Sequence, residues 1–473
     1  MPSVNYIAGN LMTDQPSRNI YLTGSLAAVF VKTAAPIILM MLVNGSFNLV
    51  DAYFLGIFVG ADALTAVTSM FPAFMLLTAL STLVANGFSS VMARQLGAGE
   101  VAAAKDTFAQ AITLSLGVCA VLIIVFFVSG SSLTLFANNG DTHLASMSYR
   151  YISILIFCSP LAFILAINGD SFRCEGHVGF MALISLLSVL LNGIFNYVLI
   201  VKLNAGVAGS AIGTVLAQFT ALFVAFAFRR SQHNHLKMPV IAVTNGRHQW
   251  RTFFALGAPS SLSYLGVALS SAAILFNLQL IDSPNYAITV GAYGIVTRLS
   301  TFIFLPLLGL SMAFQSIAGN NAGARELKRT NSSLKIAILG AFIYCISIQG
   351  LIWLLKDQIG GWFVEEVMVM QEVSRILPLM TLALFLMGPL MMISMLFQAL
   401  GDAARAGLLS LSKTYVFALP LVFILPHLLD EQGIWLAGPS AEVLALLLTI
   451  VVLYQRARQH NYRFGLFFAA EHR

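Results

Sequence analysis

Charge is scarce in this sequence. Of its 473 residues, 9% are Asp, Glu, Lys or Arg, whereas an ordinary soluble domain has about 25%. Hydrophobic residues make up 58% of the chain, and the mean hydropathy is +0.86. The longest strongly polar stretch, residues 229–251, is too short to form a core of its own. These features exclude a soluble protein and indicate a chain embedded in a membrane.

Cysteine and histidine are also few, and neither forms a recognisable pattern. The four cysteines lie singly in or beside apolar runs, so they indicate neither a disulfide framework nor a metal site. No HExxH or other ligand spacing links the eight histidines. An intramembrane enzyme would need paired acids, metal ligands or an activated nucleophile. The apolar runs hold no such cluster, so we expect neither an enzyme nor a bound metal or cofactor.

What the sequence has in abundance is long hydrophobic runs, each near the roughly 20 residues that a transmembrane helix needs. Their number predicts an all-α integral membrane protein with 12 transmembrane helices. The predicted spans are 28–55, 62–87, 106–130, 145–169, 178–201, 207–229, 251–278, 286–314, 333–355, 374–399, 407–428 and 433–455.

Lysine and arginine are distributed unevenly between the two sides that twelve spans define. One side, with both termini, carries most of them, and the other carries Arg150, Lys202, Lys356 and Arg375. Because cytoplasmic loops are enriched in basic residues, both termini are predicted to be cytoplasmic. The net charge of +6 then reflects topology and not a nucleic-acid partner. The polar first twenty residues lack the pattern of a cleavable signal. We expect a multi-pass protein of the plasma membrane, with a bacterial inner membrane favoured.

Four short patterns recur in the same order at nearly constant spacing. An even number of spans in each half means that the repeats run in the same direction, so a pseudo-two-fold axis along the membrane normal relates them. We therefore expect two six-helix lobes around a central cleft: an N-lobe (1–230), a cytoplasmic linker (231–250) and a C-lobe (251–473). The paired residues are Pro36 and Pro259, Gly97 and Gly323, Gly176 and Gly401, and Gly206 and Gly433, which lie 223 to 227 residues apart.

A polar stripe follows the first hydrophobic run. At 100° per residue, Asn44, Asn48 and Asp51 fall within about 60° of one another on a helix whose other faces are apolar. A charge near the bilayer centre costs roughly 2.5–3.5 kcal/mol, so such an acid usually faces a cavity and serves a function. The alternative is a helix-end residue in the interface. Since more apolar residues follow, we favour a functional Asp51, with Asn44 and Asn48 lining the same cavity.

Several segments together resemble the multidrug and toxic compound extrusion (MATE) transporters over nearly the whole chain. No single motif is specific, but the combination is. The segments are Pro36 with residues 48–51, 93–99 (ARQLGAG), 172–176 (FRCEG), 191–197 (LNGIFNY), 206–212 (GVAGSAI), 319–324 (GNNAGA) and 441–443 (AEV).

The resemblance implies an exporter of amphipathic, often cationic compounds, which alternates between outward-open and inward-open states and exchanges its substrate for H⁺ or Na⁺. The chain resembles the DinF-like branch, within the multidrug/oligosaccharidyl-lipid/polysaccharide exporter superfamily. In that branch a first-span carboxylate, a fifth-span pair and a sixth-span threonine couple transport to the cation. The matching positions here are Asp51, Asn192, Asn196 and Thr214.

The chain departs from that branch at Asn196, where an Asp is frequent. NorM-like relatives place acids in the seventh and tenth spans, but residues 252–281 contain none and the tenth span has only Glu372, near its outer end. Asp51 is therefore the strongest candidate for coupling. A lone buried acid favours H⁺, because protonation removes the buried charge. Na⁺ coupling remains the alternative, because the side-chain oxygens of Asn192, Asn196 and Thr214 could bind Na⁺, although a second negative charge is missing.

Other residues in the N-lobe have both a functional and a structural interpretation. Pro36 removes a backbone hydrogen bond and is either a hinge or a static kink. Asn192 and Asn196 are either ion-coupling residues or hydrogen-bonding contacts between helices. Asn168 and Asp170 either line the cytoplasmic side of the substrate cavity or cap the end of the fourth span.

Two sets in the C-lobe have the same ambiguity. Glu442 is predicted to form a structural ion pair with Arg298 or Lys413, with ion coupling as the alternative. Methionines are adaptable surfaces for varied apolar ligands, although ordinary packing is the alternative. The methionines concerned, all in the tenth span, are Met391, Met392 and Met395.

The expected partners are small drug-like molecules and membrane lipid, with no nucleic acid. A monomer is expected, because a two-lobed bundle forms its pathway without a partner. The main alternative function is a flippase for a lipid-linked saccharide or cell-wall precursor. The pyrophosphate of such a substrate requires a strongly cationic cavity, and intramembrane cations are few here.

Overall fold

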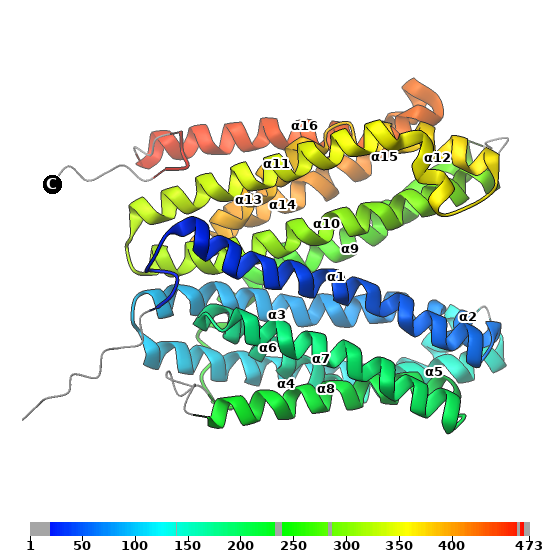
Figure 1. Cartoon of the computed structure of the whole chain (residues 1–473), viewed down its shortest axis with the longest axis horizontal. Coiled ribbons are helices and arrows are strands. Elements are labelled where there is room, and N and C mark those ends of the chain that lie inside the picture. The colour runs from blue at the N-terminus through cyan, green and yellow to red at the C-terminus, as the bar shows by residue number, and fades with distance from the viewer. Residues whose placement is uncertain (1–18, 139, 232–238, 282–285, 461–463, 468–473) are drawn as a thin grey trace, which may run out of the picture.

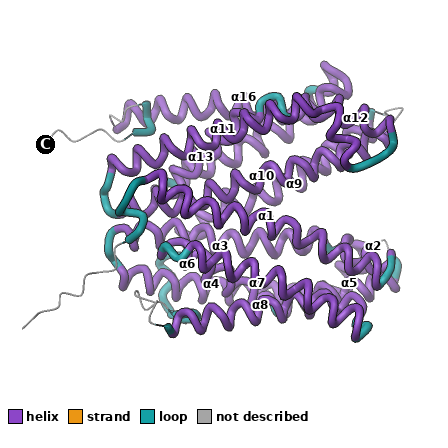
Figure 2. The backbone as a smooth tube through the Cα atoms, viewed as in Figure 1, coloured by secondary structure: helices purple, strands orange, loops and turns teal. Residues whose placement is uncertain are grey.

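The computed structural model describes residues 19–138, 140–231, 239–281, 286–460 and 464–467. Helices dominate these residues, and no β-strand is formed among them (Figure 2). Ten helices are long and apolar enough to cross a membrane. Two further pairs, bent by 48° and 46°, bring the number to twelve when each pair counts as one span. The predicted all-α fold is therefore confirmed.

The lobes are defined by their helices. The N-lobe comprises α1 (Leu26–Phe58), α2 (Ala61–Ser69), α3 (Phe71–Gly97), α4 (Val101–Ala137), α5 (Thr142–Phe157), α6 (Ser159–Glu175), α7 (Val178–Asn196), the π-helix η1 (Tyr197–Lys202) and α8 (Gly206–Arg230). The C-lobe comprises α9 (Trp250–Leu280), α10 (Tyr286–Gly323), α11 (Leu327–Ile359), the short 3₁₀ turn η2 (Gly360–Trp362), α12 (Val367–Met380), α13 (Leu384–Leu400), α14 (Ala403–Leu411), the π-helix η3 (Ser412–Ala418), α15 (Leu419–Ile424) and α16 (Pro426–His460). Residues 232–238 of the predicted linker lie outside the described residues.

Figure 1 shows α1–α8 in the lower half of the molecule and α9–α16 in the upper half. Helices α1 and α3 pack against α10 and α9, respectively, and form the contact between the lobes. The ribbons of the two lobes lie close together at the left and diverge toward the right. The left end contains the connections at 98–100, 176–177, 324–326 and 401–402, where most of the described Lys and Arg residues lie, and we call it the basic end.

Helices α3 and α10, at the contact between the lobes, extend well beyond their predicted hydrophobic runs toward the basic end. Helix α3 continues to residue 97 instead of 87, and α10 to residue 323 instead of 314. The extensions carry Ser89, Ser90, Gln315 and Asn320, which are all buried. These side chains lie between the lobes, where polar groups bond to one another. Mean hydropathy underestimates the length of such a helix, because it treats every face of the helix as if it met lipid.

The start of the second span was also predicted wrongly. The sequence indicated one helix from residue 62, but the chain breaks at Met70 between α2 and α3. Pro72 lies in the first turn of α3. A proline there loses no hydrogen bond and has the backbone angle that a helix needs, so it favours a new helix start at this point.

The predicted repeat is visible in the backbone of the connections at the basic end. After the second and eighth spans, the chain closes with the same pair of hydrogen bonds. Residues 99 and 325 then take left-handed angles of 79° and 58°. The bonded amide and carbonyl pairs are Ala98–Arg94 and Glu100–Gln95 in the N-lobe, and Ala324–Asn320 and Glu326–Asn321 in the C-lobe.

The pseudo-two-fold axis passes between Ser89 and Gln315, which are one repeat apart and lie 3.4 Å from each other (Oγ to Oε1). Reciprocal contacts flank it. A Cβ on Gly97 would lie 2.0 Å from the carbonyl oxygen of Asn320, and a Cβ on Gly323 would lie 2.0 Å from that of Arg94. A contact that recurs with its partners exchanged is what a two-fold axis produces.

Glycines also allow α3 and α9 to approach closely near the basic end. A Cβ on Gly257 would lie 1.8 Å from the carbonyl oxygen of Leu83, and one on Gly87 would lie 2.1 Å from that of Phe253. Small residues of this kind let helix backbones touch inside a membrane, where packing drives association.

Substitution Gly257→Ala is therefore expected to destabilise the closed basic end, because the new methyl group requires the lobes to separate. Overpacking of this kind costs roughly 1–3 kcal/mol, which should lower the melting temperature of the purified protein in detergent. Gly340→Ala in α11 is the matched control, since no heavy atom lies within 4 Å of its Cβ position. That control should melt at or slightly above the wild-type temperature. Equal melting temperatures for the two variants would contradict the close contact.

Candidate functional site

Asp51 lies in a polar network inside the N-lobe. It is 7% exposed, and its Oδ1 accepts hydrogen bonds from Asn196 Nδ2 (2.9 Å) and Ser210 Oγ (2.6 Å). Asn196 Nδ2 also donates to Asn192 Oδ1 (3.2 Å). Asn192 Nδ2 in turn donates to Thr214 Oγ1 (3.0 Å). The structure thus brings together the four residues predicted to couple transport to an ion. Their role in coupling stays a prediction.

Helix geometry produces this network. Asn192 and Asn196 are four residues apart on α7, and Ser210 and Thr214 are four apart on α8, so each pair shares one helix face. Helix α1 supplies Asp51 against both faces. The π-helix η1 begins directly after Asn196, and π-helical turns are frequent at functional sites because they interrupt the regular hydrogen-bond ladder.

Ser210 was missed by the sequence analysis, although its hydroxyl makes the shortest bond to Asp51 in this network. It lies within the 206–212 motif and precedes Thr214 by four residues. The spacing along α8 was therefore an available signal.

The network has an unused acceptor. Asn196 Oδ1 is buried without a hydrogen-bond partner, while the amide nitrogen serves both Asp51 and Asn192. As arranged, the network suits an ionised Asp51, because a carboxylate only accepts. A protonated Asp51 becomes a donor, and a 180° rotation of the Asn196 amide would present an oxygen to it. The same oxygens are hard ligands of the type that Na⁺ prefers.

The structure says less about the other residues singled out in the first span, which are Pro36, Asn44 and Asn48. Pro36 lies inside α1, which continues as one helix through it, so its action as a hinge stays a prediction. Asn44 is exposed. The side chain of Asn48 lies outside the described residues.

Arg173 ties the two lobes together at the basic end. Its guanidinium is fully buried and donates from the N-lobe to Met312 O (2.7 Å) and Ser316 Oγ (2.7 Å) of α10. Asp170 Oδ1 lies 2.9 Å from the same guanidinium. The pairing with Arg173 was not anticipated for Asp170, and its place in the substrate cavity stays a prediction. A buried guanidinium needs an anion beside it, and Asp170 supplies it within the lobe contact.

Residues 19–24 cross the basic end from one lobe to the other. The Tyr21 hydroxyl donates to the backbone oxygen of Arg173 in the N-lobe. Toward the C-lobe, Asn19 Nδ2 donates to Asn320 Oδ1 (2.7 Å), and Arg329 Nη2 donates to the backbone oxygen of Tyr21 (3.1 Å). Burial raises the pKa of the Tyr21 phenol, which keeps it protonated and able to donate.

Asn168 was interpreted wrongly as a cavity or cap residue. It is fully buried, and its Nδ2 donates to Ile164 O and Val240 O, both at 2.9 Å. The second bond fixes the described part of the linker to α6. Hydrogen bonds from the Thr244 and Gln249 amides to α4 add to this docking.

A cavity of about 240 Å³ lies mainly in the C-lobe, between α9, α10, α13, η3 and α16. Met391 and Met395 line it, and their role as an adaptable surface for substrates stays a prediction. Met392 does not line the cavity, because it is fully buried in a hydrophobic core. Residues four apart share a helix face, whereas the next residue points about 100° away.

Glu442 on α16 pairs with Lys413 on η3, so the predicted pair with Arg298 is wrong and the alternative partner is correct. Helix α16 packs directly on η3, which places the two side chains together. Both line the C-lobe cavity.

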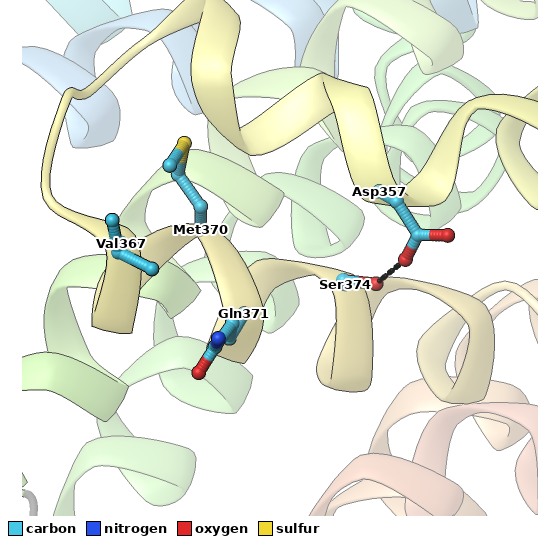
Figure 3. Close-up of a pocket in the computed structure, with 5 residues that line it drawn as sticks. All are labelled: Asp357, Val367, Met370, Gln371 and Ser374. Carbon is cyan, nitrogen blue, oxygen red and sulfur yellow. Dashed lines mark hydrogen bonds between the residues drawn. The ribbon is translucent and has the colours of Figure 1, made fainter.

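A second hollow of similar volume lies at the end of the C-lobe remote from the basic end, between the end of α11 and α12 (Figure 1, Figure 3). Asp357 accepts a hydrogen bond from Ser374 there, beside Val367, Met370 and Gln371. None of these residues belongs to the Asp51 network or to the C-lobe cavity. Over the described part of the chain, no group of three or more His, Cys, Asp or Glu residues could hold a metal ion.

Two repeated lobes of membrane-spanning helices, with a buried carboxylate in one and a cavity in the other, define a polytopic transport protein. The sequence profile of the MatE family matches residues 36–198 and matches again at 259–424. The chain belongs to this family, the MATE transporters, whose members are not enzymes. The two matches begin at Pro36 and Pro259, which confirms the repeat.

Known proteins are similar in sequence to this chain over most of its length. The probable multidrug resistance protein YoeA of Bacillus subtilis (strain 168) is 24% identical over 430 residues, which cover 87% of this chain and 90% of that protein. The multidrug export protein MepA of Staphylococcus aureus (strain NCTC 8325 / PS 47) is 21% identical, covering 89% and 91%. A multidrug resistance MATE transporter solved in an outward-facing conformation has the same fold, with a TM-score of 0.82 and 22% identity over 94% of this chain and 98% of that one.

Proposed function

We propose that this protein is a secondary active multidrug exporter that moves amphipathic, mainly cationic compounds out of the cell in exchange for H⁺. The observation that carries the proposal is the Asp51 network. One buried carboxylate, held by Asn196 and Ser210, is the single acid in the network. Among the described residues no Lys, Arg or His forms an ion pair with it. Proton and cationic substrate would compete for that charge, and such competition is sufficient for antiport.

The shape of the molecule supports alternating access. The lobes are joined at the basic end by Arg173, by residues 19–24 and by the glycine contacts, while the ribbons diverge at the other end (Figure 1). The abundance of Lys and Arg indicates that the basic end is cytoplasmic. The structure then corresponds to an outward-facing state of a plasma-membrane protein, in a bacterium of the kind in which its relatives occur, with both termini inside. Two lobes in one chain form the whole pathway, so we propose a monomer.

The proposal is tested by ethidium transport in proteoliposomes under a pH gradient without Na⁺, and then under a Na⁺ gradient at equal pH. We expect the pH gradient alone to drive ethidium movement. If only the Na⁺ gradient drives it, Asn192, Asn196 and Thr214 become Na⁺ ligands and the H⁺ assignment is wrong. If neither gradient moves ethidium, the substrate class is wrong, and assays with a lipid-linked saccharide would follow.

A further inference from the structure

The C-lobe cavity contains a charged pair that the proposed H⁺ exchange does not use. Lys413 and Glu442 both line it and form an ion pair through Glu442 Oε1. Among the described residues that line the cavity there is no other Asp, Glu, Lys or Arg. The cavity therefore has opposite charges side by side and no net charge.

One oxygen of this pair has no partner. Glu442 is 7% exposed, and its Oε2 is buried without a hydrogen bond. The hydroxyls of Ser263, Ser410 and Thr449 line the same cavity but donate to carbonyl oxygens of their own helices, at 2.6 to 2.7 Å. Their protons are unavailable to Oε2. A buried carboxylate oxygen without a donor is costly, so a donor brought by a ligand would be bound favourably here.

Lys413 offers the complementary group. Its ammonium has three donors, and its side chain remains 34% exposed while it bonds Glu442 Oε1. An acceptor on a ligand could therefore reach the ammonium without breaking the ion pair. Tyr264, Phe304 and Met391 provide aromatic and polarisable walls nearby.

We infer that the C-lobe cavity binds compact aromatic zwitterions. The carboxylate of the ligand would bind the Lys413 ammonium, and its ammonium would donate to Glu442 Oε2. A ligand with a net charge would leave that charge uncompensated in a mostly apolar cavity, which is unfavourable. The volume of about 240 Å³ is below the usual range for drug-sized ligands, so a compact ring system fits best.

The pseudo-symmetry of the lobes explains how two chemistries coexist. The Asp51 network uses α7 and α8, the fifth and sixth spans, and the charged pair uses η3 and α16, in the eleventh and twelfth. Equivalent helix pairs thus carry an ion-coupling network in one lobe and a substrate site in the other. The inference rests on the proposed function, since it names a substrate class for the same exporter.

The test is equilibrium binding of radiolabelled tryptophan to the purified full chain in detergent, with two matched analogues as competitors. Tryptophan is zwitterionic, its methyl ester is only cationic and N-acetyltryptophan is only anionic. We expect tryptophan to bind with a Kd of roughly 1 mM or below, and each analogue at least about tenfold more weakly. Equal affinities for tryptophan and the methyl ester, or no tryptophan binding up to about 10 mM, would overturn the inference.

Variants assign the binding to the pair. Lys413→Met/Glu442→Gln removes both charges together and should lower tryptophan affinity roughly tenfold or more, whereas Lys356→Met, an exposed lysine on α11, should leave it unchanged. If the double variant fails to fold, Glu442→Asp serves in its place. It keeps the negative charge but withdraws the carboxylate oxygens from the cavity, so it should also bind tryptophan more weakly. Unchanged affinity in the folded pair variants overturns the site. Because binding needs no gradient, the two proposals are tested separately in the wild-type protein. Absence of tryptophan binding with intact pH-driven ethidium export contradicts only this inference, whereas tryptophan binding without ethidium export contradicts only the proposed function.

Discussion

Replacement of Asp51 by Asn is expected to reduce pH-driven ethidium export to the level of protein-free vesicles. Asn has nearly the same shape, and its oxygen can still accept from Asn196 and Ser210. It can neither release nor take up a proton, so the exchange of H⁺ for substrate stops while the fold remains. The measurement is the initial rate of ethidium movement, normalised to the amount of folded protein by size-exclusion chromatography.

Ser210→Ala is the informative companion to this variant. It removes one donor to the ionised Asp51 and leaves the carboxyl group in place. Export should therefore persist, with its pH dependence displaced toward higher pH, because the ionised form has lost a hydrogen bond. Export by Asp51→Asn at the wild-type rate would show that the coupling carboxylate lies elsewhere, and Glu442 would be the next candidate.

Replacement of Arg173 by Met is expected to have the largest effect on stability. It leaves Asp170 buried without its cation and removes the bonds to Met312 and Ser316 across the lobe contact. Loss of one partner of a buried ion pair costs about 3–5 kcal/mol. The melting temperature in detergent should fall markedly, and the basic end should open more readily to thiol reagents directed at an introduced cysteine.

The double variant Arg173→Met/Asp170→Asn separates the two contributions. With both charges removed, most of the stability should return, because the remaining loss is that of neutral hydrogen bonds. If Arg173→Met alone were no less stable than the double variant, Asp170 would not depend on this guanidinium, and the ion pair would not contribute to the closed state.

The sequence predicted the Asp51 network more completely than the C-lobe cavity, because the family resemblance named its members and helix spacing supports their arrangement. Asn192 and Asn196 are one turn apart, as are Ser210 and Thr214, so periodicity alone places each pair on one face. The grouping of Asn192, Asn196 and Thr214 with Asp51 came from the resemblance to the MATE family, and the helix spacing is consistent with it; Ser210, which the resemblance did not supply, was missed.

The errors occurred where a residue had more than one polar neighbour available. Asn168 was assigned to a cavity because it is polar near a helix end, yet the linker backbone provides its partner. The pairing of Asp170 with Arg173 was likewise not anticipated. For Glu442, the sequence offered Arg298 and Lys413 equally, and only the packing of η3 on α16 selected the second.

The sequence by itself determined that the chain spans the membrane, that it contains two parallel repeats, and that one acid in the first span is exceptional. These properties depend on composition, periodicity and spacing, which the sequence records directly. Only the tertiary structure decided how far α3 and α10 extend, which methionines line the cavity, and which lysine faces Glu442. Those outcomes depend on which helix faces meet, and a linear pattern gives the direction of a side chain without the identity of what lies opposite it.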